Sequence, residues 1–162
     1  AKMRAEDEKT YESFQRECAK ASSFLLICDN CGEIVLDKLF LEQLKIRFPK
    51  ISVKIFVRGK DVLNDATMED ALYTGLDQMG EVFAGGEAIA GLVYDMLPEE
   101  LKSVLDGADV ILAKGQGNYE TLSGQGRHMF YAFLCKCDLF VNRFQVPRLT
   151  GMFVEENGQI EK

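Results

Sequence analysis

Several features are missing from this 162-residue sequence, and their absence narrows the possible functions. No run of eighteen apolar residues occurs, so no membrane-spanning helix is expected. The first ten residues are rich in charge and do not form a signal peptide, so we expect a cytoplasmic protein. The sequence has no excess of basic residues: it contains 26 acidic and 19 basic residues, and its net charge is −7. This balance argues against nucleic acid or an anionic membrane as the main partner.

Histidine and cysteine are also used sparingly. His128 is the only histidine, and no Ser-His-Asp arrangement has further support. The five cysteines form an odd number without a secretory signal, which indicates reduced thiols. Cys28 and Cys31 form a C-x-x-C pair that suits a thiol redox motif, and Cys135 and Cys137 would complete a four-cysteine zinc site. We favour packing roles for the cysteines, because Asp29 and Asn30 between the first two have a stronger use.

What is present is an alternation of strand and helix patterns over one domain, residues 1–162. Helices are expected at 6–21, 33–48, 67–76 and 98–107, and the helix at 67 begins with a Thr67–Asp70 capping box. Strands are expected at 23–28, 51–57, 81–84, 109–113, 130–135 and, as an edge strand, 151–155. This order predicts an α/β fold with a mostly parallel sheet and helices on both faces.

Three polar clusters follow three of the predicted strands: Asp29-Asn30-Cys31-Gly32-Glu33, Asn64-Asp65-Ala66-Thr67 and Lys114-Gly115-Gln116-Gly117-Asn118. Ligands of open α/β sheets bind outside the carboxyl ends of the strands, so we expect one shared site. Asp29, Asn30 and Asp65 offer hard oxygen ligands for Mg²⁺, Mn²⁺ or a similar ion. The alternative is that Asp29 and Asn30 cap a helix and that Asp65 is a turn residue.

Within the third cluster, residues 115–118 are expected to form a glycine-rich turn. Gly115 and Gly117 would let backbone N–H groups approach an anion, and Lys114 would add a point charge. The segment is neither a Walker A loop nor a G-x-G-x-x-G motif. The alternative is a plain turn from strand to helix.

Taken together, the three motifs resemble the signature turns of the damage-control phosphatases, an ARMT-like family long catalogued as domain of unknown function eighty-nine. The resemblance extends from about Phe14 to Val154. It implies a three-layer, Rossmann-like α/β/α core and a divalent metal, commonly Mn²⁺, Co²⁺ or Ni²⁺. It also implies hydrolysis of phosphate monoesters of small metabolites, such as sugar phosphates or damaged phosphometabolites.

The resemblance also assigns roles to individual residues. Asp29, Asn30 and Asp65 match the metal ligands, Lys114 matches the phosphate-binding lysine, and Glu33, Asn64 and Asn118 match residues that line the same pocket. In the mechanism that follows, the metal activates a water, Lys114 and the N–H groups of the Gly115–Gly117 turn hold phosphate oxygens, and Glu33 orients the water or acts as base.

Family members also carry a helical segment ahead of this core. The chain is therefore expected either to lack that segment or to be a short member. The alternatives are a redox or zinc module, a non-catalytic sugar-phosphate binder, and a carboxyl methyltransferase. We rank the last lowest, because Asp29-Asn30 occupies the place of its glycine-rich turn.

Overall fold

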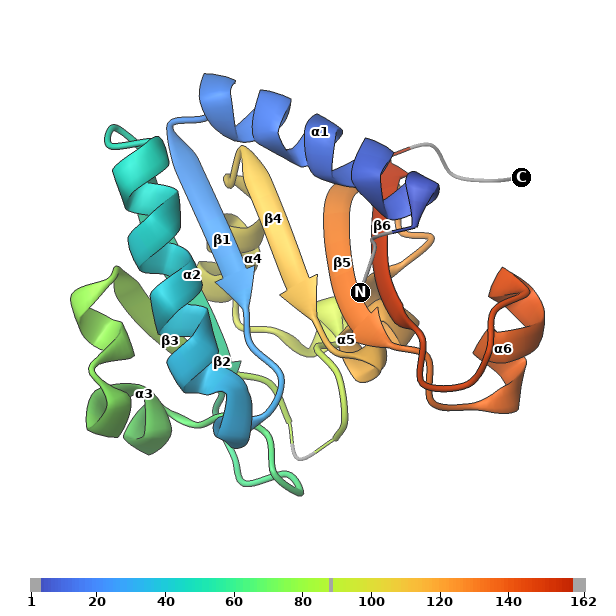
Figure 1. Ribbon diagram of the computed structural model, residues 1–162. Helices are drawn as coiled ribbons and strands as arrows, with labels where there is room; N and C mark the ends of the chain where they lie inside the picture. Colours follow the sequence, from blue (N-terminus) through green and yellow to red (C-terminus); the bar gives the residue numbers. More distant parts are fainter. Residues whose placement is uncertain (1–3, 88, 159–162) are drawn as a thin grey trace.

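The computed structural model describes residues 4–87 and 89–158, whose strands pair into one six-stranded sheet (Figure 1). The strands are β1 Ser23–Ile27, β2 Ser52–Arg58, β3 Glu81–Gly85, β4 Val110–Lys114, β5 His128–Leu134 and β6 Gly151–Asn157. Their order is β3-β2-β1-β4-β5-β6, and every neighbouring pair is parallel except β5–β6. This confirms the mostly parallel sheet and the edge position of the last strand.

Helices cover both faces of the sheet, as expected for a three-layer α/β/α fold. One face carries α1 Ala5–Lys20, α2 Ile34–Arg47 and α3 Met68–Thr74, and the other carries α4 Glu99–Asp106, α5 Gln116–Leu122 and α6 Asp138–Phe144. Three short 3₁₀ turns are η1 Cys31–Glu33, η2 Leu76–Gln78 and η3 Tyr94–Met96. None of the helices described is long and apolar enough to cross a membrane.

The strand pattern explains why there are two cores. In β1, Phe24 and Leu26 point to the core under α1 and α2, whereas Leu25 and Ile27 point to the core under α4 and α5. All four are at most 1 % exposed, so β1 is buried on both faces. Such a strand has a continuous apolar sequence rather than an alternating one.

The predicted helix start at Thr67 is present. The Thr67 hydroxyl accepts from the Asp70 N–H, and Asp70 Oδ2 accepts from Thr67 N at 2.8 Å, which is a capping box. Gly75 ends the helix in the left-handed region, with a φ of 70°.

The prediction of a glycine-rich turn over residues 115–118 was wrong in extent. Helix α5 begins at Gln116, so only Gly115 lies in the turn. Buried Tyr119 and Leu122 anchor this helix in the core and outweigh the weak helix propensity of its glycine. Helix α6 was not predicted at all.

The order of the strands in the sheet indicates where a ligand would bind. β1 is flanked by β2 and β4, so the strand order reverses between β1 and β4, where open α/β sheets bind their ligands. Ile27 pairs with Phe56 on one side and with Ala113 on the other. The segments that follow β1, β2 and β4 therefore emerge side by side.

Candidate metal and phosphate site

The turns after β1 and β2 are joined by backbone hydrogen bonds. Ala66 N donates to Asp29 O at 2.7 Å, and Cys31 N donates to Asn64 O at 2.8 Å. Asn30 and Asp65 form an isolated antiparallel bridge between these two contacts. The structure thus brings Asp29, Asn30 and Asp65 together from two separate strand ends.

The local charge at Asp29 is strongly negative. Burial raises the pKa of Asp29 to about 6, and the charges of Asp65 and Glu33 add to the effect. Asn30 lies between the acids, since its Nδ2 donates to Asp29 Oδ2 at 2.8 Å and to Glu33 Oε1 at 3.3 Å. Glu33 Oε1 also accepts from Asn30 N, so Asn30 serves as a helix cap as well as a site residue.

Gly115 is required by the position of Asp29. It has a φ of 87° and a ψ of 150°, a backbone conformation that is essentially restricted to glycine. A Cβ atom at this position would lie 2.1 Å from Asp29 Cγ. The Gly115 N–H donates to Ala132 O at 2.9 Å within the sheet. Gly115 therefore makes room for a carboxylate and does not offer its N–H to a phosphate.

Lys114 is held between two acids of α2 and its 3₁₀ turn. Its Nζ lies 2.6 Å from Asp37 Oδ1 and 3.3 Å from Glu33 Oε1. Burial opposes the charge on Lys114, but the two acids outweigh it and raise the pKa of Lys114. Burial likewise opposes ionisation of Glu33, yet Lys114 and the Asn30 groups lower its pKa. Lys114 and Glu33 are therefore both charged at neutral pH.

Asp37 was not anticipated from the sequence. It is 3 % exposed, and within the described residues its Oδ2 has no hydrogen-bond partner. Burial raises the pKa of Asp37, while Lys114 opposes the rise. Asp37 follows Glu33 by four residues, so it shares the helix face that points to the site. This four-residue spacing from Glu33 is the feature of the sequence from which Asp37 could have been predicted as a site residue.

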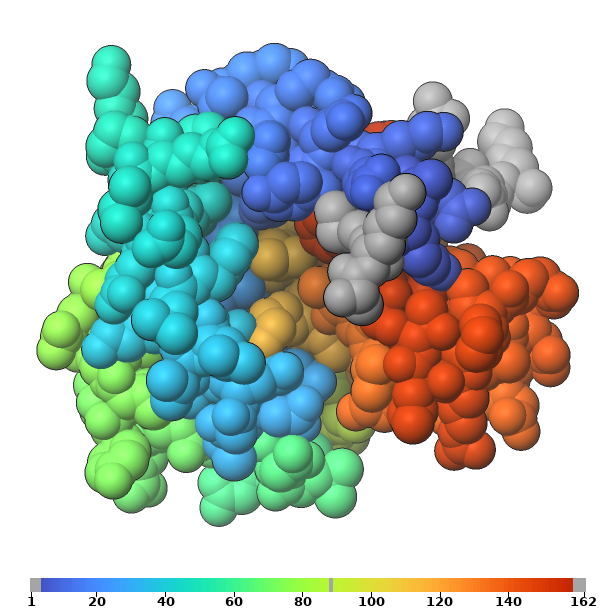
Figure 2. All heavy atoms as spheres, viewed as in Figure 1, coloured from blue at the N-terminus to red at the C-terminus, as the bar shows by residue number. Residues whose placement is uncertain are grey.

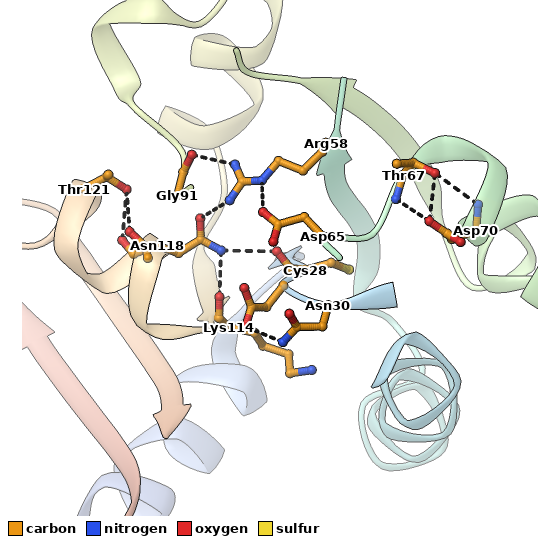
Figure 3. Close-up of polar contacts among 12 residues, drawn as sticks. Cys28, Asn30, Arg58, Asp65, Thr67, Asp70, Gly91, Lys114, Asn118 and Thr121 are labelled. Carbon is orange, nitrogen blue, oxygen red and sulfur yellow. Dashed lines mark hydrogen bonds and ion pairs between the residues drawn. The ribbon is translucent and has the colours of Figure 1, made fainter. Parts of the chain in front are cut away.

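A buried hydrogen-bond network connects Asp65 to Arg58 and Asn118 (Figure 3). Arg58 Nε donates to Asp65 Oδ2 at 2.7 Å, and Arg58 Nη2 donates to Asn118 Oδ1 at 3.1 Å. Asn118 Nδ2 in turn donates to Cys28 O at 3.2 Å and to Lys114 O at 2.6 Å. Asn118 is fully buried, so its amide holds the protein together and does not face a ligand.

A cavity of about 940 Å³ opens beside the acids. In Figure 2 it is the hollow between the cyan atoms of α2 and the orange atoms of the C-terminal part, with gold atoms of the β4 region at its floor. Five of the predicted site residues line it: Asp29, Asn30, Glu33, Lys114 and Gly115. Four do not: Asn64, Asp65, Gly117 and Asn118.

Lys136 also lines this cavity, and the sequence reasoning missed it. Two positive charges lower the pKa of Asp29, and the effect of Lys136 is larger than that of Lys114. The backbone N–H of Lys136 donates to Gln116 Oε1 at 2.9 Å, which ties the segment after β5 to the start of α5. No ion pair of Lys136 is found among the described residues. Lys136 is thus a cation available to a ligand in the cavity.

The cysteines do not form a metal-binding centre in the part of the chain that is described. All five are free thiols. Burial raises the pKa of Cys28 well above its usual value, the opposite of what an activated thiol requires. No three His, Cys, Asp or Glu side chains among residues 4–87 and 89–158 are grouped as a metal site. This removes the geometric basis for the four-cysteine zinc alternative.

The oxygen atoms of Asp29, Asn30 and Asp65 form a set of ligands that fits a hard divalent cation. Asp29 and Asp65 supply carboxylate oxygens from two strands, and the raised pKa of Asp29 marks negative charge that a cation would relieve. Only one oxygen of Asp65 is engaged by Arg58, and within the described residues Asp65 Oδ1 accepts no hydrogen bond. Such a site would rely on two carboxylates, one amide oxygen and ligands from outside these side chains.

The fold and the site together define a Rossmann-like α/β protein with an acid cluster and two lysines at its ligand-binding edge. Residues 6–150 match the model of the damage-control phosphatase ARMT1-like domain, and the chain belongs to this family. The resemblance inferred from the three sequence motifs is thereby confirmed.

Two relatives from archaea carry the family's name. A damage-control phosphatase of Pyrococcus horikoshii is 34 % identical over 151 residues, which cover 91 % of this chain and 50 % of that protein. A damage-control phosphatase of Archaeoglobus fulgidus is 37 % identical over 114 residues, 69 % of this chain and 39 % of that protein. An uncharacterised protein of Methanocaldococcus jannaschii is 38 % identical over 117 residues, 70 % of this chain and 38 % of that protein.

The fold likeness agrees with the sequence likeness. The crystal structure of a P. horikoshii protein of the domain of unknown function eighty-nine family superposes with a TM-score of 0.83 at 31 % identity. The match covers 89 % of this chain and 50 % of that one. The chain thus spans half or less of the length of each of these relatives.

Proposed function

We propose that this chain is the catalytic core of a phosphatase that hydrolyses phosphate monoesters of small metabolites, sugar phosphates or damaged phosphometabolites. The observation that carries the proposal is the meeting of Asp29, Asn30 and Asp65 with Lys114 at the point where the strand order reverses. A divalent cation and a phosphate dianion need opposite surroundings, and this site offers both side by side. Two of the relatives are themselves named damage-control phosphatases.

Asp29, Asn30 and Asp65 are the residues that would hold the cation. Their hard oxygens suit Mn²⁺, Co²⁺, Ni²⁺ or Mg²⁺, and we expect one of the first three. A bound ion of this kind supplies Lewis-acid chemistry and offsets the charge that develops on a transferred phosphoryl group.

The remaining groups of the cavity bind and orient the substrate. Lys136 has no ion pair among the described residues and can bind phosphoryl oxygens directly. Lys114 adds a second cation, fixed in place by Asp37. Glu33 is ionised, so it can accept a hydrogen bond from the attacking water and hold it in line. The cavity volume of about 940 Å³ leaves room for a metabolite beyond its phosphate.

The experiment is a phosphatase screen of the purified chain against a panel of phosphometabolites, with Mn²⁺, Co²⁺, Ni²⁺ and Mg²⁺ tested separately after chelation. Activity should vanish in excess chelator and return with one or more of these ions. Full activity at a metal content measured as zero would refute the cation site. Phosphate binding without any hydrolysis would instead favour the non-catalytic binder.

Asp65→Asn is the matched active-site variant, because it keeps one oxygen ligand but removes a charge. It should lower both cation affinity and turnover. Asp70→Asn is its control, since Asp70 caps α3 through the N–H and hydroxyl of Thr67 and should affect melting more than cation binding. If Asp65→Asn binds the cation like the parent, the shared site is wrong.

A further inference from the structure

Arg58 has no role in the chemistry described above, yet its side chain makes three hydrogen bonds near the acids (Figure 3). It ends β2 and is 4 % exposed. Three different nitrogens of its guanidinium donate to three different segments: Nε to Asp65 Oδ2, Nη1 to Gly91 O at 2.7 Å and Nη2 to Asn118 Oδ1. Its backbone N–H donates to Ala66 O at 2.8 Å, one residue beyond Asp65.

Asn118 carries this network across to the other half of the site. Its Nδ2 donates to the carbonyls of Cys28 and Lys114, which lie just before Asp29 and Gly115. The carboxylate of Asp65 is therefore linked, through Arg58 and Asn118, to the backbone that positions Asp29 and the lysine. Two of these bonds join distant parts of the chain, since Arg58 and Asn118 are 60 residues apart and Asn118 and Cys28 are 90 residues apart.

The charges explain why such a link is needed. Asp29 and Asp65 carry like charges that repel one another, because the backbone bonds between the turns after β1 and β2 hold the two residues close together. Without a fixed partner, the Asp65 carboxylate would be expected to turn away from Asp29 when no cation is bound. A buried guanidinium offers a rigid fork of donors that a lysine lacks, so it can hold a carboxylate in one orientation.

We propose that Arg58 is a positioning residue of the cation site, which fixes the carboxylate of Asp65 toward Asp29 and is itself fixed by Asn118. The inference rests on the proposed cation site. Partners that orient a metal ligand typically change metal affinity by roughly 10- to 100-fold when they are removed. Arg58→Lys keeps the positive charge but loses the planar set of N–H donors, so it should weaken Mn²⁺ binding by about this factor.

The decisive measurement is a double-variant cycle in Mn²⁺ affinity, by calorimetry on the full chain. If Arg58 acts through Asp65, Arg58→Lys should cost little once Asp65→Asn is present. The double variant should then bind Mn²⁺ within about twofold of Asp65→Asn alone, the usual scatter of such cycles. If Arg58 only stabilised the fold, the losses of Mn²⁺ affinity caused by the two substitutions would instead add. Additive losses would overturn the proposal.

Two further variants complete the design. Asn118→Ser removes the acceptor of Arg58 Nη2, leaves the Asp65 contact in place and should weaken Mn²⁺ binding less than Arg58→Lys does. Its cycle with Asp65→Asn decides the question if Arg58→Lys does not fold. Arg127→Lys is the control, because Arg127 also bonds a carboxylate, Asp106, at 3.1 Å but lies outside the cavity.

The outcomes separate this inference from the proposed function. Parent-like Mn²⁺ affinity in folded Arg58→Lys and Asn118→Ser would refute the positioning role alone, and so would a loss of equal size in Arg127→Lys. A parent chain that binds no divalent cation would refute the cation site and this inference together.

Discussion

Gly115→Ala should damage the cation site through a single added methyl group. Gly115 has a φ of 87° and a ψ of 150°, a region that costs other residues about 1–3 kcal/mol. For a chain of this size, that cost corresponds to a fall in melting temperature of about 2–12 °C. The backbone strain alone therefore predicts a folded but less stable protein.

The larger effect comes from the contact with Asp29. The new Cβ would lie 2.1 Å from Asp29 Cγ and 2.3 Å from its Oδ2. Because carbon atoms pack no closer than about 3.5 Å, the carboxylate must retreat by more than about 1 Å. A displacement of this size in a catalytic site can cost roughly 100-fold in rate. Gly115→Ala should therefore lose most Mn²⁺ affinity and turnover.

Gly124→Ala separates the two effects. Gly124 also has a positive φ, 76°, but a Cβ there meets nothing within 4 Å. It should lose stability through strain and keep parent-like Mn²⁺ affinity by calorimetry. If Gly115→Ala and Gly124→Ala show the same Mn²⁺ affinity, the packing of Gly115 against Asp29 has no functional meaning and the reasoning is refuted.

Two more predictions concern charged groups. Lys114→Ala leaves buried Asp37 without its ion partner, so it should cost about 3–5 kcal/mol of stability and weaken inorganic phosphate binding tenfold or more, while Mn²⁺ still binds. Adding Asp37→Asn should restore melting but not phosphate affinity; recovery of phosphate binding would show that Lys114 does not contact the ligand. The second prediction is that Asp29 contributes stability to the metal-free chain that is lost as pH rises from about 4 to about 6. The pKa of Asp29 is raised to about 6 by folding, so the folded state binds the proton more tightly. In melts across this pH range, the stability of Asp29→Asn relative to the parent should rise with pH; an unchanged difference would contradict the assignment.

The fold could be predicted because its main signals are local. The buried apolar run of β1, the Thr67–Asp70 capping box and the Pro98 helix start each depend on a few neighbouring residues. The missed elements lack such signals. Helix α6 spans only seven residues and has Cys137 at its N-cap without a side-chain capping bond.

The site was only partly predictable, because its supporting contacts are not local. Asp29, Asn30 and Lys114 follow strands and could be found from the sequence. Arg58 lies one residue beyond the predicted strand 51–57, and its role could not be foreseen, because a buried arginine is rare and its partners lie 7 to 60 residues away. Asn118 was assigned to the ligand pocket, because nothing in the sequence shows that its amide is used by two backbone carbonyls.

The register of β1 against β4 has a consequence for how the molecule assembles. Ile27 pairs with Ala113, so this central pairing closes a long stretch of chain and is entropically costly early in folding. Asp29 and Gly115 meet only after that closure. The proposed cation ligands Asp29, Asn30 and Asp65 follow β1 and β2, so an ion held by them binds only chains in which these two segments have met. Its binding free energy is then added to the native state. We expect such an ion to slow the opening of the finished molecule much more than it speeds its formation.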